Sequence, residues 1–415
     1  MGDQPARERL NAMRILLVCA AYPPFGKGGG PATSAAIARA LAAAGHEVEV
    51  ITASDTPLDE QHEGYRVRSI GSPNIYADYW TRRPAWQRLL WHMLENGNPR
   101  AYVRMRAAMR AFAPDLVATA SIENVNVATW LAARRLGIPV LHFPHSYFVL
   151  CWRGTMFRGG RRCTRRCTDC RIASLGKERF ARHVGTVVGE SRFVVDRHRE
   201  HGVFVDARRL TIPTPIPLPV PLPAAPARAL RAAAPVTIGY IGNISVEKDL
   251  ATLARATRRL IDRVGDRARV VVAGSGAEPL VATLRALFPP GTTFLGWTDP
   301  ADFYRQVDLV VVPSAWDEPY GRVSVEPLAY GIPVVAARAG GLPENVVEGV
   351  SGHVFTPGDD AGLAVILERL VTDPDALHRL SAGALARAGD YGAAAYVARL
   401  DAAVRIAVGQ GEDVG

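Results

Sequence analysis

A proline stands at every second position from Pro213 to Pro223, near the middle of the chain. Proline has no backbone N–H and a fixed φ, so this run can neither continue a helix nor lie in the centre of a sheet. It is typical of an extended linker of limited flexibility. The 415 residues also exceed what one hydrophobic core usually organises. We therefore predict an N-terminal domain over 13–212, a linker over 213–234 and a C-terminal domain over 235–389.

Both halves alternate short apolar runs with longer Ala- and Leu-rich stretches of helical period. In the first half the apolar runs cover 15–18, 48–51, 67–70, 116–119, 140–142 and 186–188; in the second they begin at Val236 and continue over 270–273, 293–295, 309–312 and 334–336. Such alternation predicts parallel sheets with helices on both faces. The expected fold class is α/β, with two Rossmann-like domains.

The composition narrows the class of protein only slightly. Hydrophobic residues make up 48% and charged residues 21%, which is ordinary for a folded protein. No run of 18 apolar residues predicts a membrane span, and the polar start of the chain lacks the apolar stretch of a signal peptide, which favours a cytoplasmic protein. A net charge of +9 suits anionic nucleotides or an anionic membrane surface, but does not choose between them. We expect no nucleic acid partner.

Two glutamates follow the apolar run 309–312. Glu318 falls in the loop at the carboxyl end of this expected strand, and Glu326 falls about one turn into the helix expected behind it. Open α/β sheets bind ligands at this edge. A carboxylate can accept two sugar hydroxyls, and the backbone N–H groups from Tyr320 to Val323 suit a phosphate. The segment predicts a site for a hydroxyl-rich phosphorylated ligand; the alternative is a pair of solvated acids.

The seven residues between these glutamates are part of a longer pattern. Further motifs lie over 331–335, 340–344 and 352–355, and upstream over 240–248, 272–276 and 294–297. In this order they resemble the retaining GT-B glycosyltransferases of family 4, the glycosyl transferases group 1. The resemblance implies two domains that face each other across a cleft, with a C-terminal helix within 390–410 that crosses back to the first domain.

The same resemblance implies an enzyme of the hexosyltransferase type. It would transfer a sugar with retention from a nucleotide diphosphate sugar to a hydroxyl of a glycan, a glycolipid or a lipid-linked intermediate, as in polysaccharide biosynthesis. No cofactor is needed for this chemistry, because the departing phosphate can take the acceptor proton. A nucleotide-sugar epimerase of the same architecture and a non-catalytic nucleotide-sugar-binding regulator are the alternatives.

The resemblance also assigns roles in the second domain. Glu326 would bind the ribose, Glu318 the donor sugar, and Lys248 the leaving diphosphate. Asn243 stands where relatives carry an arginine, so one of two expected cations is missing. The remaining donor-binding candidates are the helix-start residues and a glycine near the base: Tyr320, Gly321, Arg322 and Gly296.

In the first domain, Gly28, Gly29 and Gly30 follow the strand expected over 15–18 and precede a helix. Consecutive glycines permit positive φ and let backbone amides approach an anion. The resemblance places this loop at the donor diphosphate and the acceptor, and a plain turn is the alternative. A dinucleotide oxidoreductase is disfavoured, because Pro31 replaces the third glycine of its motif.

His145 follows the strand expected over 140–142. Family members commonly have a His-Asp pair here near the donor sugar, so we expect His145 to be catalytic, with Glu318 and Lys248. This chain has Ser146 in place of the aspartate. The alternative is a loop histidine satisfied by a backbone carbonyl.

Four of the five cysteines, Cys151, Cys163, Cys167 and Cys170, lie close together in the sequence, among seven arginines between Arg153 and Arg171. Four thiolates could hold a structural zinc ion, and nearby positive charge favours thiolates. A redox pair and free thiols on a mobile loop are the alternatives.

The segment 80–110 contains Trp80, Trp86 and Trp91 together with seven arginines. Basic residues interleaved with tryptophan predict a peripheral contact with an anionic membrane, here the inner face of the plasma membrane. The alternative is a solvated helical face with the tryptophans in the core.

Overall fold

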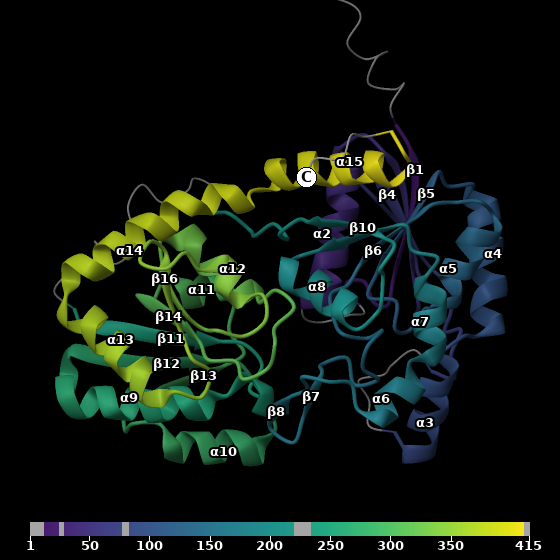
Figure 1. Ribbon diagram of the computed structural model, residues 1–415. Helices are drawn as coiled ribbons and strands as arrows, with labels where there is room; N and C mark the ends of the chain where they lie inside the picture. The colour runs from purple at the N-terminus through teal and green to yellow at the C-terminus, as the bar shows by residue number, and fades with distance from the viewer. Residues whose placement is uncertain (1–11, 25–28, 77–82, 220–233, 411–415) are drawn as a thin grey trace, which may run out of the picture. The chain divides into compact units, whose positions relative to one another are not determined.

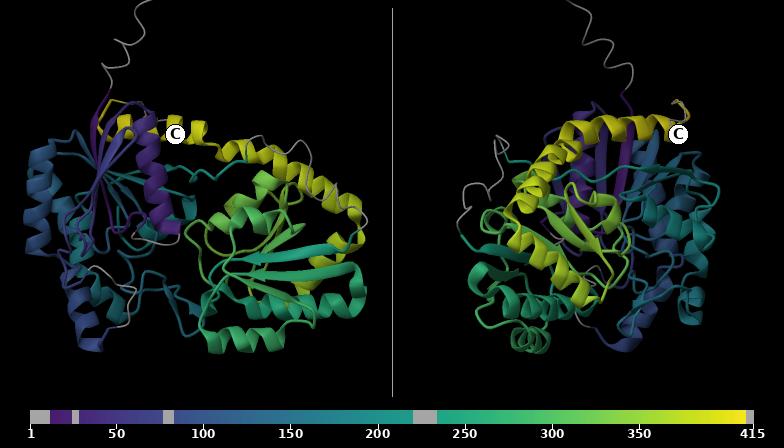
Figure 2. Two further views of the ribbon diagram at one scale, coloured as in Figure 1. Left: turned by 180° about the vertical axis from the view of Figure 1, so that it is seen from behind. Right: turned by 60° about the vertical axis from the view of Figure 1, so that its left-hand side comes forward.

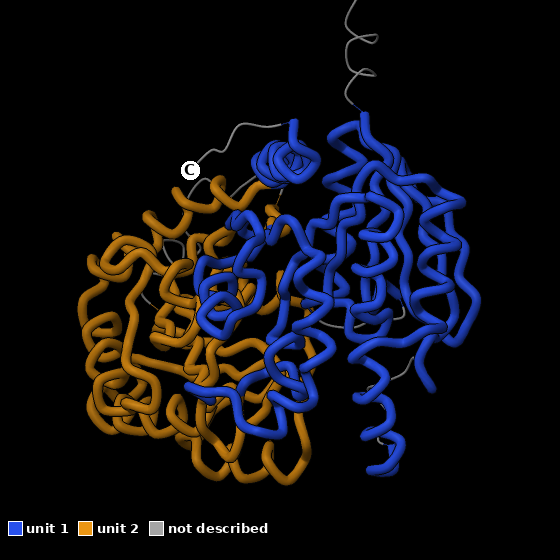
Figure 3. The backbone as a smooth tube through the Cα atoms, turned by 45° about the vertical axis from the view of Figure 1, so that its right-hand side comes forward, with its two compact units in different colours: residues 1–156, 163–214, 393–415 blue, residues 157–162, 215–392 orange. Residues whose placement is uncertain are grey.

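The computed structural model describes residues 12–24, 29–76, 83–219 and 234–410. Figures 1 and 2 show the chain, and Figure 3 shows its division into two compact units. Unit 1 comprises residues up to 156, 163–214 and from 393 onward, and unit 2 comprises 157–162 and 215–392. Within the described residues, no helix is both long and apolar enough to cross a bilayer.

Unit 1 is built on an eight-stranded sheet with the order β10-β9-β6-β5-β1-β2-β4-β3. All neighbouring strands are parallel except β3, which pairs antiparallel with β4. Their bounds are β1 (Arg14–Cys19), β2 (Glu47–Thr52), β3 (Asp59–His62), β4 (Tyr65–Ser69), β5 (Leu116–Ala120), β6 (Val140–Phe143), β9 (Thr186–Gly189) and β10 (Arg208–Thr211). The central strands are buried over nearly their whole length, whereas the edge strands β3 and β10 are short, polar and mostly exposed. Polar edges of this kind discourage pairing with another chain.

The helices of unit 1 connect these strands and cover the sheet. They are α2 (Gly29–Ala43), α3 (Ala85–Leu94), α4 (Pro99–Phe112), α5 (Ala128–Arg135), α6 (Thr168–Ala173), α7 (Leu175–Ala181), α8 (Arg192–Glu200) and α15 (Ala393–Ala407). Asn98 caps α4 by accepting from the N–H groups of Arg100 and Ala101, and Pro99 occupies the first turn, where no N–H is needed.

Helix α15 comes from the C-terminal end of the chain and packs against α2 of unit 1 (Figure 1). Its buried residues Tyr396, Leu400 and Val404 join the core of this unit. The Nδ1 atom of the buried His46 accepts from the N–H of Met13, so the neutral imidazole donates from Nε2 to Asp401 of α15 at 3.0 Å. This helix therefore crosses back as expected.

Unit 2 has a six-stranded, fully parallel sheet with the order β13-β12-β11-β14-β15-β16. Its strands are β11 (Val236–Ile241), β12 (Ala268–Ala273), β13 (Thr293–Gly296), β14 (Leu309–Val312), β15 (Val334–Ala337) and β16 (Gly352–Phe355). From β11 the strand order runs through β12 to β13 on one side, and from β14 it runs through β15 to β16 on the other, so the order reverses between β11 and β14. Such a switch point opens a ligand crevice at the carboxyl ends of the strands.

Helices and short 3₁₀ segments connect the strands of unit 2: η2 (Val246–Lys248), α9 (Leu250–Val264), η3 (Gly265–Arg267), α10 (Glu278–Leu287), α11 (Pro300–Tyr304), η4 (Arg322–Ser324), η5 (Glu326–Tyr330), α12 (Leu342–Asn345), α13 (Asp360–Thr372), α14 (Pro374–Arg387) and η6 (Ala388–Tyr391). Along α9, Leu250, Leu253, Leu260 and Val264 are buried at helical spacing. Two Rossmann-like domains with parallel sheets confirm the predicted fold class.

The proline run does not begin as a free linker. Ile216 is buried in unit 2, and its N–H donates to the carbonyl of Tyr391 at 3.1 Å. Proline at alternate positions leaves the intervening N–H groups available for such contacts. The rest of the predicted linker, from residue 220 to 233, lies outside the described residues.

Candidate active site

Glu318 lies in the loop after β14 and forms an ion pair with Lys248. Its Oε1 accepts from Lys248 Nζ at 2.5 Å and from Ser314 Oγ at 2.7 Å, and the Glu318 side chain is only 6% exposed. Lys248 ends η2, which follows β11, the neighbour of β14. The switch point in the strand order therefore joins two of the predicted catalytic residues.

Two glycines keep the backbone around Glu318 close to the next loop. A Cβ on Gly340 would lie 2.1 Å from the Glu318 carbonyl oxygen, which accepts from the N–H of Gly341 at 2.7 Å. Gly321 has φ 82°, and a Cβ there would lie 2.4 Å from Leu342 Cδ2. Both positions therefore require glycine to hold the Glu318 loop in place.

Glu326 is held by two donors. Its Oε1 accepts from Arg322 Nε at 3.0 Å and its Oε2 from the Tyr304 hydroxyl at 3.1 Å. Burial and the adjacent carboxylate of Glu326 raise the pKa of Tyr304 well above its usual value, so the phenol stays a neutral donor. The two contacts fix a half-buried carboxylate at the carboxyl edge of the sheet.

The helix that we expected behind Glu318 is instead two short 3₁₀ segments, η4 and η5. Gly321 and Gly331, both with positive φ, precede and follow them. Pro327 follows Glu326 and supplies no N–H for a helical hydrogen bond. Glu326 still lies about one turn beyond the start of η4, so the correction concerns the type of helix.

The loop that carries Asn243 and Lys248 packs against the loop after β12, which contains Gly274 and Ser275. The N–H of Ile244 donates to the carbonyl of Ser275 at 2.8 Å. A Cβ on Gly274 would lie 1.8 Å from the carbonyl oxygen of Gly242, so the two backbones approach more closely than any other residue would permit. Asn243 is exposed, and its carbonyl accepts from the Tyr240 hydroxyl at 2.8 Å.

The residues expected to contact the nucleotide base lie at the end of β13, an edge strand of the sheet in unit 2. Gly296 ends β13 with φ 70°, and its carbonyl accepts from the N–H of Gly274 at 2.6 Å. Trp297, which follows it, is 81% exposed. An indole ring so exposed can stack on a flat ligand.

In unit 1, His145 follows β6 and faces Ser121, which follows the neighbouring strand β5. Nδ1 of His145 lies 3.3 Å from Ser121 Oγ, and its Nε2 is buried without a hydrogen-bond partner among the described residues. Burial lowers the pKa of His145, so the neutral ring is favoured. The ring therefore contacts the hydroxyl of Ser121, and not a backbone carbonyl as in the alternative interpretation.

The glycine segment differs from expectation. Gly29 and Gly30 lie in the first turn of α2, and Gly30 does not have positive φ. A Cβ on Gly30 would lie 3.9 Å from Ser121 Oγ, which is an ordinary van der Waals contact, so packing alone does not require glycine there. The third residue of the predicted set, Gly28, lies outside the described residues.

Glu123 is a site residue that sequence reasoning missed. Ser146 Oγ donates to Glu123 Oε1 at 2.7 Å, and the N–H of Phe148 donates to Ser146 Oγ at 3.2 Å. Burial raises the pKa of Glu123, and its Oε2 has no described partner. A carboxylate from the neighbouring strand thus reaches the position where the resemblance led us to expect an aspartate. Its position three residues beyond β5, at the ligand-binding edge, was the available signal.

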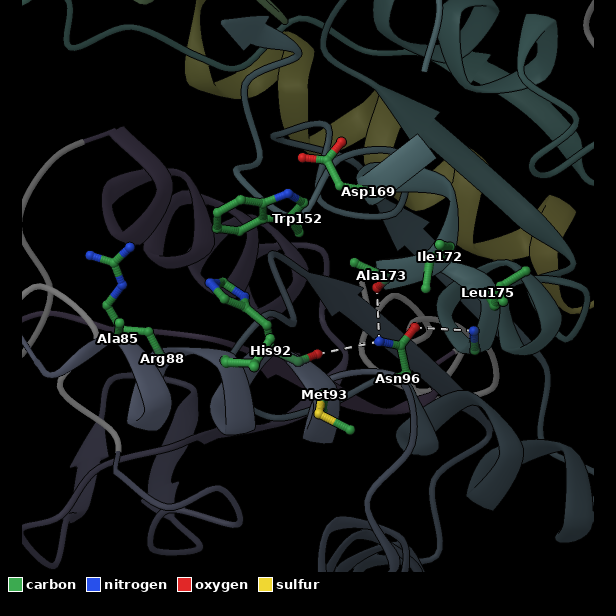
Figure 4. A pocket seen from close by; sticks show the side chains of 12 residues that line it. Ala85, Arg88, His92, Met93, Asn96, Trp152, Asp169, Ile172, Ala173 and Leu175 are labelled. Atoms are coloured by element: carbon green, nitrogen blue, oxygen red, sulfur yellow. Dashed lines mark hydrogen bonds between the residues drawn. The ribbon is translucent and has the colours of Figure 1, made fainter. Parts of the chain in front are cut away.

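A mainly apolar pocket of about 710 Å³ lies in unit 1 between α3 and the α6–α7 segment (Figure 4). Four of its residues are large, apolar and between 63% and 65% exposed: Leu89, Met93, Ile172 and Leu175. Asn96 joins the two walls, because its side chain donates to Ala173 O at 2.8 Å and accepts from the N–H of Gly176 at 3.0 Å.

The two described tryptophans of the segment 80–110 differ in exposure. Trp86 is 65% exposed on α3, but Trp91 is buried and its Nε1 donates to Tyr76 O at 3.1 Å. Trp91 faces inward because it lies on the packed side of α3, where it also stacks on Tyr76. Trp80 lies outside the described residues.

Three of the four clustered cysteines come together. Cys170 Sγ lies 3.5 Å from both Cys151 Sγ and Cys167 Sγ, and none of the cysteines forms a disulfide. The Asp169 carboxylate, the Cys167 sulfur and the Cys170 sulfur lie within 4.8 Å of one another.

Comparison with known proteins identifies the family of both units. Residues 235–373 match the model "Glycosyl transferases group 1", and residues 28–215 match the model "Glycosyl transferase 4-like domain". Two relatives are similar in sequence. An uncharacterised 42.6 kDa protein in the cps region of Klebsiella pneumoniae is 25% identical over 80% of this chain and 87% of its own. The D-inositol 3-phosphate glycosyltransferase of Thermobispora bispora is 31% identical over 65% of this chain and 66% of its own.

Solved structures share the fold at lower identity. Sucrose-phosphate synthase from Thermosynechococcus elongatus has a TM-score of 0.72 and 20% identity, over 95% of this chain and 98% of its own. HepE from Anabaena, solved in complex with UDP-glucose, has a TM-score of 0.66 and 21% identity, over 94% of this chain and 98% of its own.

Proposed function

Because this chain is a glycosyltransferase of group 1 with the GT-B fold, we propose that it transfers a sugar from a nucleotide diphosphate sugar to an acceptor hydroxyl with retention of the anomeric configuration. The observation that carries the proposal is the pair of glutamates after β14, each with its own donors: Lys248 and Ser314 for Glu318, Arg322 and Tyr304 for Glu326. The UDP-glucose complex of HepE, which shares the fold, supports a nucleotide sugar as the donor.

In unit 2, Glu326 binds the ribose hydroxyls and Glu318 orients the donor sugar. Lys248 and the backbone N–H groups of Tyr320, Gly321 and Arg322 stabilise the charge that develops on the leaving diphosphate. Donors that are already oriented stabilise this charge without reorganising as the bond breaks. The base lies near Gly296 and Trp297.

In unit 1, His145 and the start of α2 with Gly29 and Gly30 contact the transferred sugar and the acceptor. His145 is held at Nδ1 by Ser121, and its neutral Nε2 is left to bind a sugar hydroxyl. The acceptor oxygen attacks the anomeric carbon on the face from which the phosphate departs, and its proton passes to a phosphate oxygen. Retention follows from attack on that face, and no step of this reaction requires a cofactor.

The acceptor is a lipid-linked intermediate or glycolipid, and the pocket beside α3 holds part of its hydrocarbon chain. Apolar side chains line the pocket, and the polar Arg88 and the arginine-rich segment after Arg153 suit a lipid phosphate. Trp86, Leu89 and Leu90 expose apolar surface on the same helix. The protein then works as a peripheral protein at the cytoplasmic face of the membrane.

The reaction is tested by incubating the protein with UDP-, GDP-, ADP- and dTDP-sugars and a panel of polyprenyl phosphate-linked saccharides. Nuclear magnetic resonance of the product should show the same anomeric configuration as in the donor. An inverted product would contradict the retaining mechanism. If the protein binds a donor but releases no nucleoside diphosphate with any acceptor, the non-catalytic regulator is favoured. The absence of a cation at Asn243 is the reason to consider that alternative.

A further inference from the structure

Between β6 and β9 lies a long segment with little regular structure, which belongs to unit 1 except for residues 157–162 of unit 2. Its strands β7 (Phe157–Arg158) and β8 (Arg161–Arg162) have two residues each, and the helices α6 and α7 have six and seven. Elements this short do not stabilise themselves, because helix formation needs several turns to offset its nucleation cost. Cross-links are the usual means of ordering such a segment.

The cysteines of this segment approach one another from separate elements. Cys151 precedes the β7–β8 hairpin, Cys167 is the N-cap of α6, and Cys170 lies inside α6. Cys151 and Cys170 are 4% and 3% exposed. Three thiols from separate elements therefore meet at one place, which the packing of a single buried cysteine would not require.

The spacing of the sulfurs distinguishes between two kinds of cross-link. Cys170 Sγ lies 3.5 Å from each of its two neighbours. Disulfide sulfurs are about 2.05 Å apart. Sulfurs bound about 2.3 Å from a tetrahedral zinc ion lie about 3.8 Å from one another, as the edges of the tetrahedron. The two observed separations are close to this edge length and far from that of a disulfide.

We propose that Cys151, Cys163, Cys167 and Cys170 bind one structural zinc ion, which goes beyond the transferase function and does not depend on it. Four thiolates leave no position for water, so the ion fixes structure and takes no part in chemistry. Each coordinating thiol releases its proton to solvent, and no cysteine changes oxidation state.

The surroundings suit the charge of such a site. Zinc with four thiolates carries two net negative charges, and seven arginines lie between Arg153 and Arg171. Among them, the largely buried Arg166 donates from Nε to Leu150 O at 3.0 Å and pairs with Glu178. Arg166 thus holds the backbone next to Cys151 while it contributes positive charge.

The fourth ligand is Cys163, four residues before Cys167 and directly after β8. Its N–H donates to the carbonyl of Met156 at 2.8 Å, which brings the end of the hairpin back toward the residues after Cys151. Asp169 is the competing ligand, since its carboxylate lies within 4.8 Å of two of the sulfurs. A sulfur ligand is expected instead, because closed structural sites are built from cysteine and histidine.

The site would order the wall of the apolar pocket. Trp152, next to Cys151, and Asp169, Ile172 and Ala173, around Cys170, all line it (Figure 4). One ion bound to Cys151 and Cys170 therefore fixes two parts of that wall at once.

The test is elemental analysis of the full chain, purified without chelator and dialysed against metal-free buffer. We expect about one zinc per chain. Cys170→Ser and Cys163→Ser should lose it, whereas the matched variants Asp169→Asn and Cys19→Ser should keep it. Zinc lost from Asp169→Asn but kept by Cys163→Ser would overturn the assignment of the fourth ligand.

Alkylation of the unaltered protein gives a reading that does not depend on whether the variants fold. With zinc bound, the four cysteines should resist alkylation, and a strong chelator should expose them and lower the melting temperature. Absence of metal with the four thiols freely alkylated, or a disulfide among them found by mass spectrometry, would overturn the proposal.

Discussion

Lys248 Nζ and Glu318 Oε1 lie 2.5 Å apart, which couples the residue proposed for the leaving diphosphate to the residue proposed for the donor sugar. The Glu318 carboxylate is nearly buried, and the ammonium of Lys248 also lies 5.4 Å from the centre of the Trp316 ring. An incoming diphosphate would compete with Glu318 for the same ammonium. The pair therefore orients both side chains before the donor arrives.

Removing Lys248 should affect both stability and catalysis. Lys248→Ala leaves the buried Glu318 without its cation, and we expect a loss of roughly 1–3 kcal/mol in the free energy of unfolding. The loss stays below that for a fully buried pair, because 23% of the Lys248 side chain is exposed. Adding Glu318→Gln should restore part of the stability but none of the turnover. Urea unfolding and initial rates measure the two effects; near-normal turnover of Lys248→Ala would remove the lysine from the reaction.

Asn243→Arg tests the cation that the chain lacks. If Asn243 faces the diphosphate, the new charge-assisted contact should tighten nucleoside diphosphate binding by roughly 1–3 kcal/mol. Turnover should not rise, because slower product release can limit it. Calorimetry with the nucleoside diphosphate is the measurement, with Asn243→Gln as the uncharged control. Equal affinity in both variants would mean that the phosphates lie elsewhere.

Ser146→Asp would introduce the acid that relatives carry, but it would place this acid next to the carboxyl group of Glu123. Two carboxyl groups so close cannot both ionise, so the folded variant should hold a proton that the unfolded chain has already lost at neutral pH. A folded-state pKa raised in this way makes stability fall as pH rises, by up to about 1.4 kcal/mol per pH unit. The variant should therefore be more destabilised at about pH 8 than at about pH 5.

Two controls isolate this repulsion. Ser146→Asn adds similar bulk without charge, and Glu123→Gln combined with Ser146→Asp removes one acid of the pair. Both should show the pH dependence of the unaltered protein in thermal unfolding. The same pH dependence in Ser146→Asp itself would show that Glu123 does not share its site.

The pocket beside α3 should govern contact with lipid. Met93→Asp or Leu175→Asp places a charge in the apolar lining, and we expect about tenfold weaker binding to vesicles that contain polyprenyl phosphate, because burial of one large apolar side chain is worth roughly 1.5–3 kcal/mol. Val365→Asp, at a similarly exposed position on α13 of unit 2, is the matched control. Vesicle sedimentation gives the affinities, and equal binding by all four proteins would exclude the pocket as the lipid site.

Much of the fold could be predicted from sequence because its central strands are parallel and buried on both faces. Runs such as 116–120 and 309–312 are apolar at every position or nearly so, and the structure has strands there. The edge strands β3 and β10 were not expected, because their residues are polar and their pairing depends on neighbours distant in the sequence.

The site was predictable where a motif is local and not where it depends on strand order. Glu318 and Glu326 lie at the predicted edge of the sheet because the apolar run forms a strand, and the loop that follows it begins at that edge. The contact between Ser146 and Glu123, by contrast, spans 23 residues and exists because β5 and β6 are neighbours. The outward position of Trp86 and the inward position of Trp91 likewise depend on which side of α3 packs, which an irregular pattern of apolar residues does not determine.

A donor site around Glu326 can be tested by calorimetry of UDP, GDP, ADP and dTDP binding to the protein and to Glu326→Ala. One nucleotide should bind the unaltered protein, and the variant should lose roughly 1.5–3 kcal/mol of that affinity, because a carboxylate contact to ribose hydroxyls is lost. Asp262→Ala, an exposed acid on α9 of the same unit, should bind as tightly as the unaltered protein. A folded Glu326→Ala protein with undiminished affinity would show that Glu326 does not bind the nucleotide.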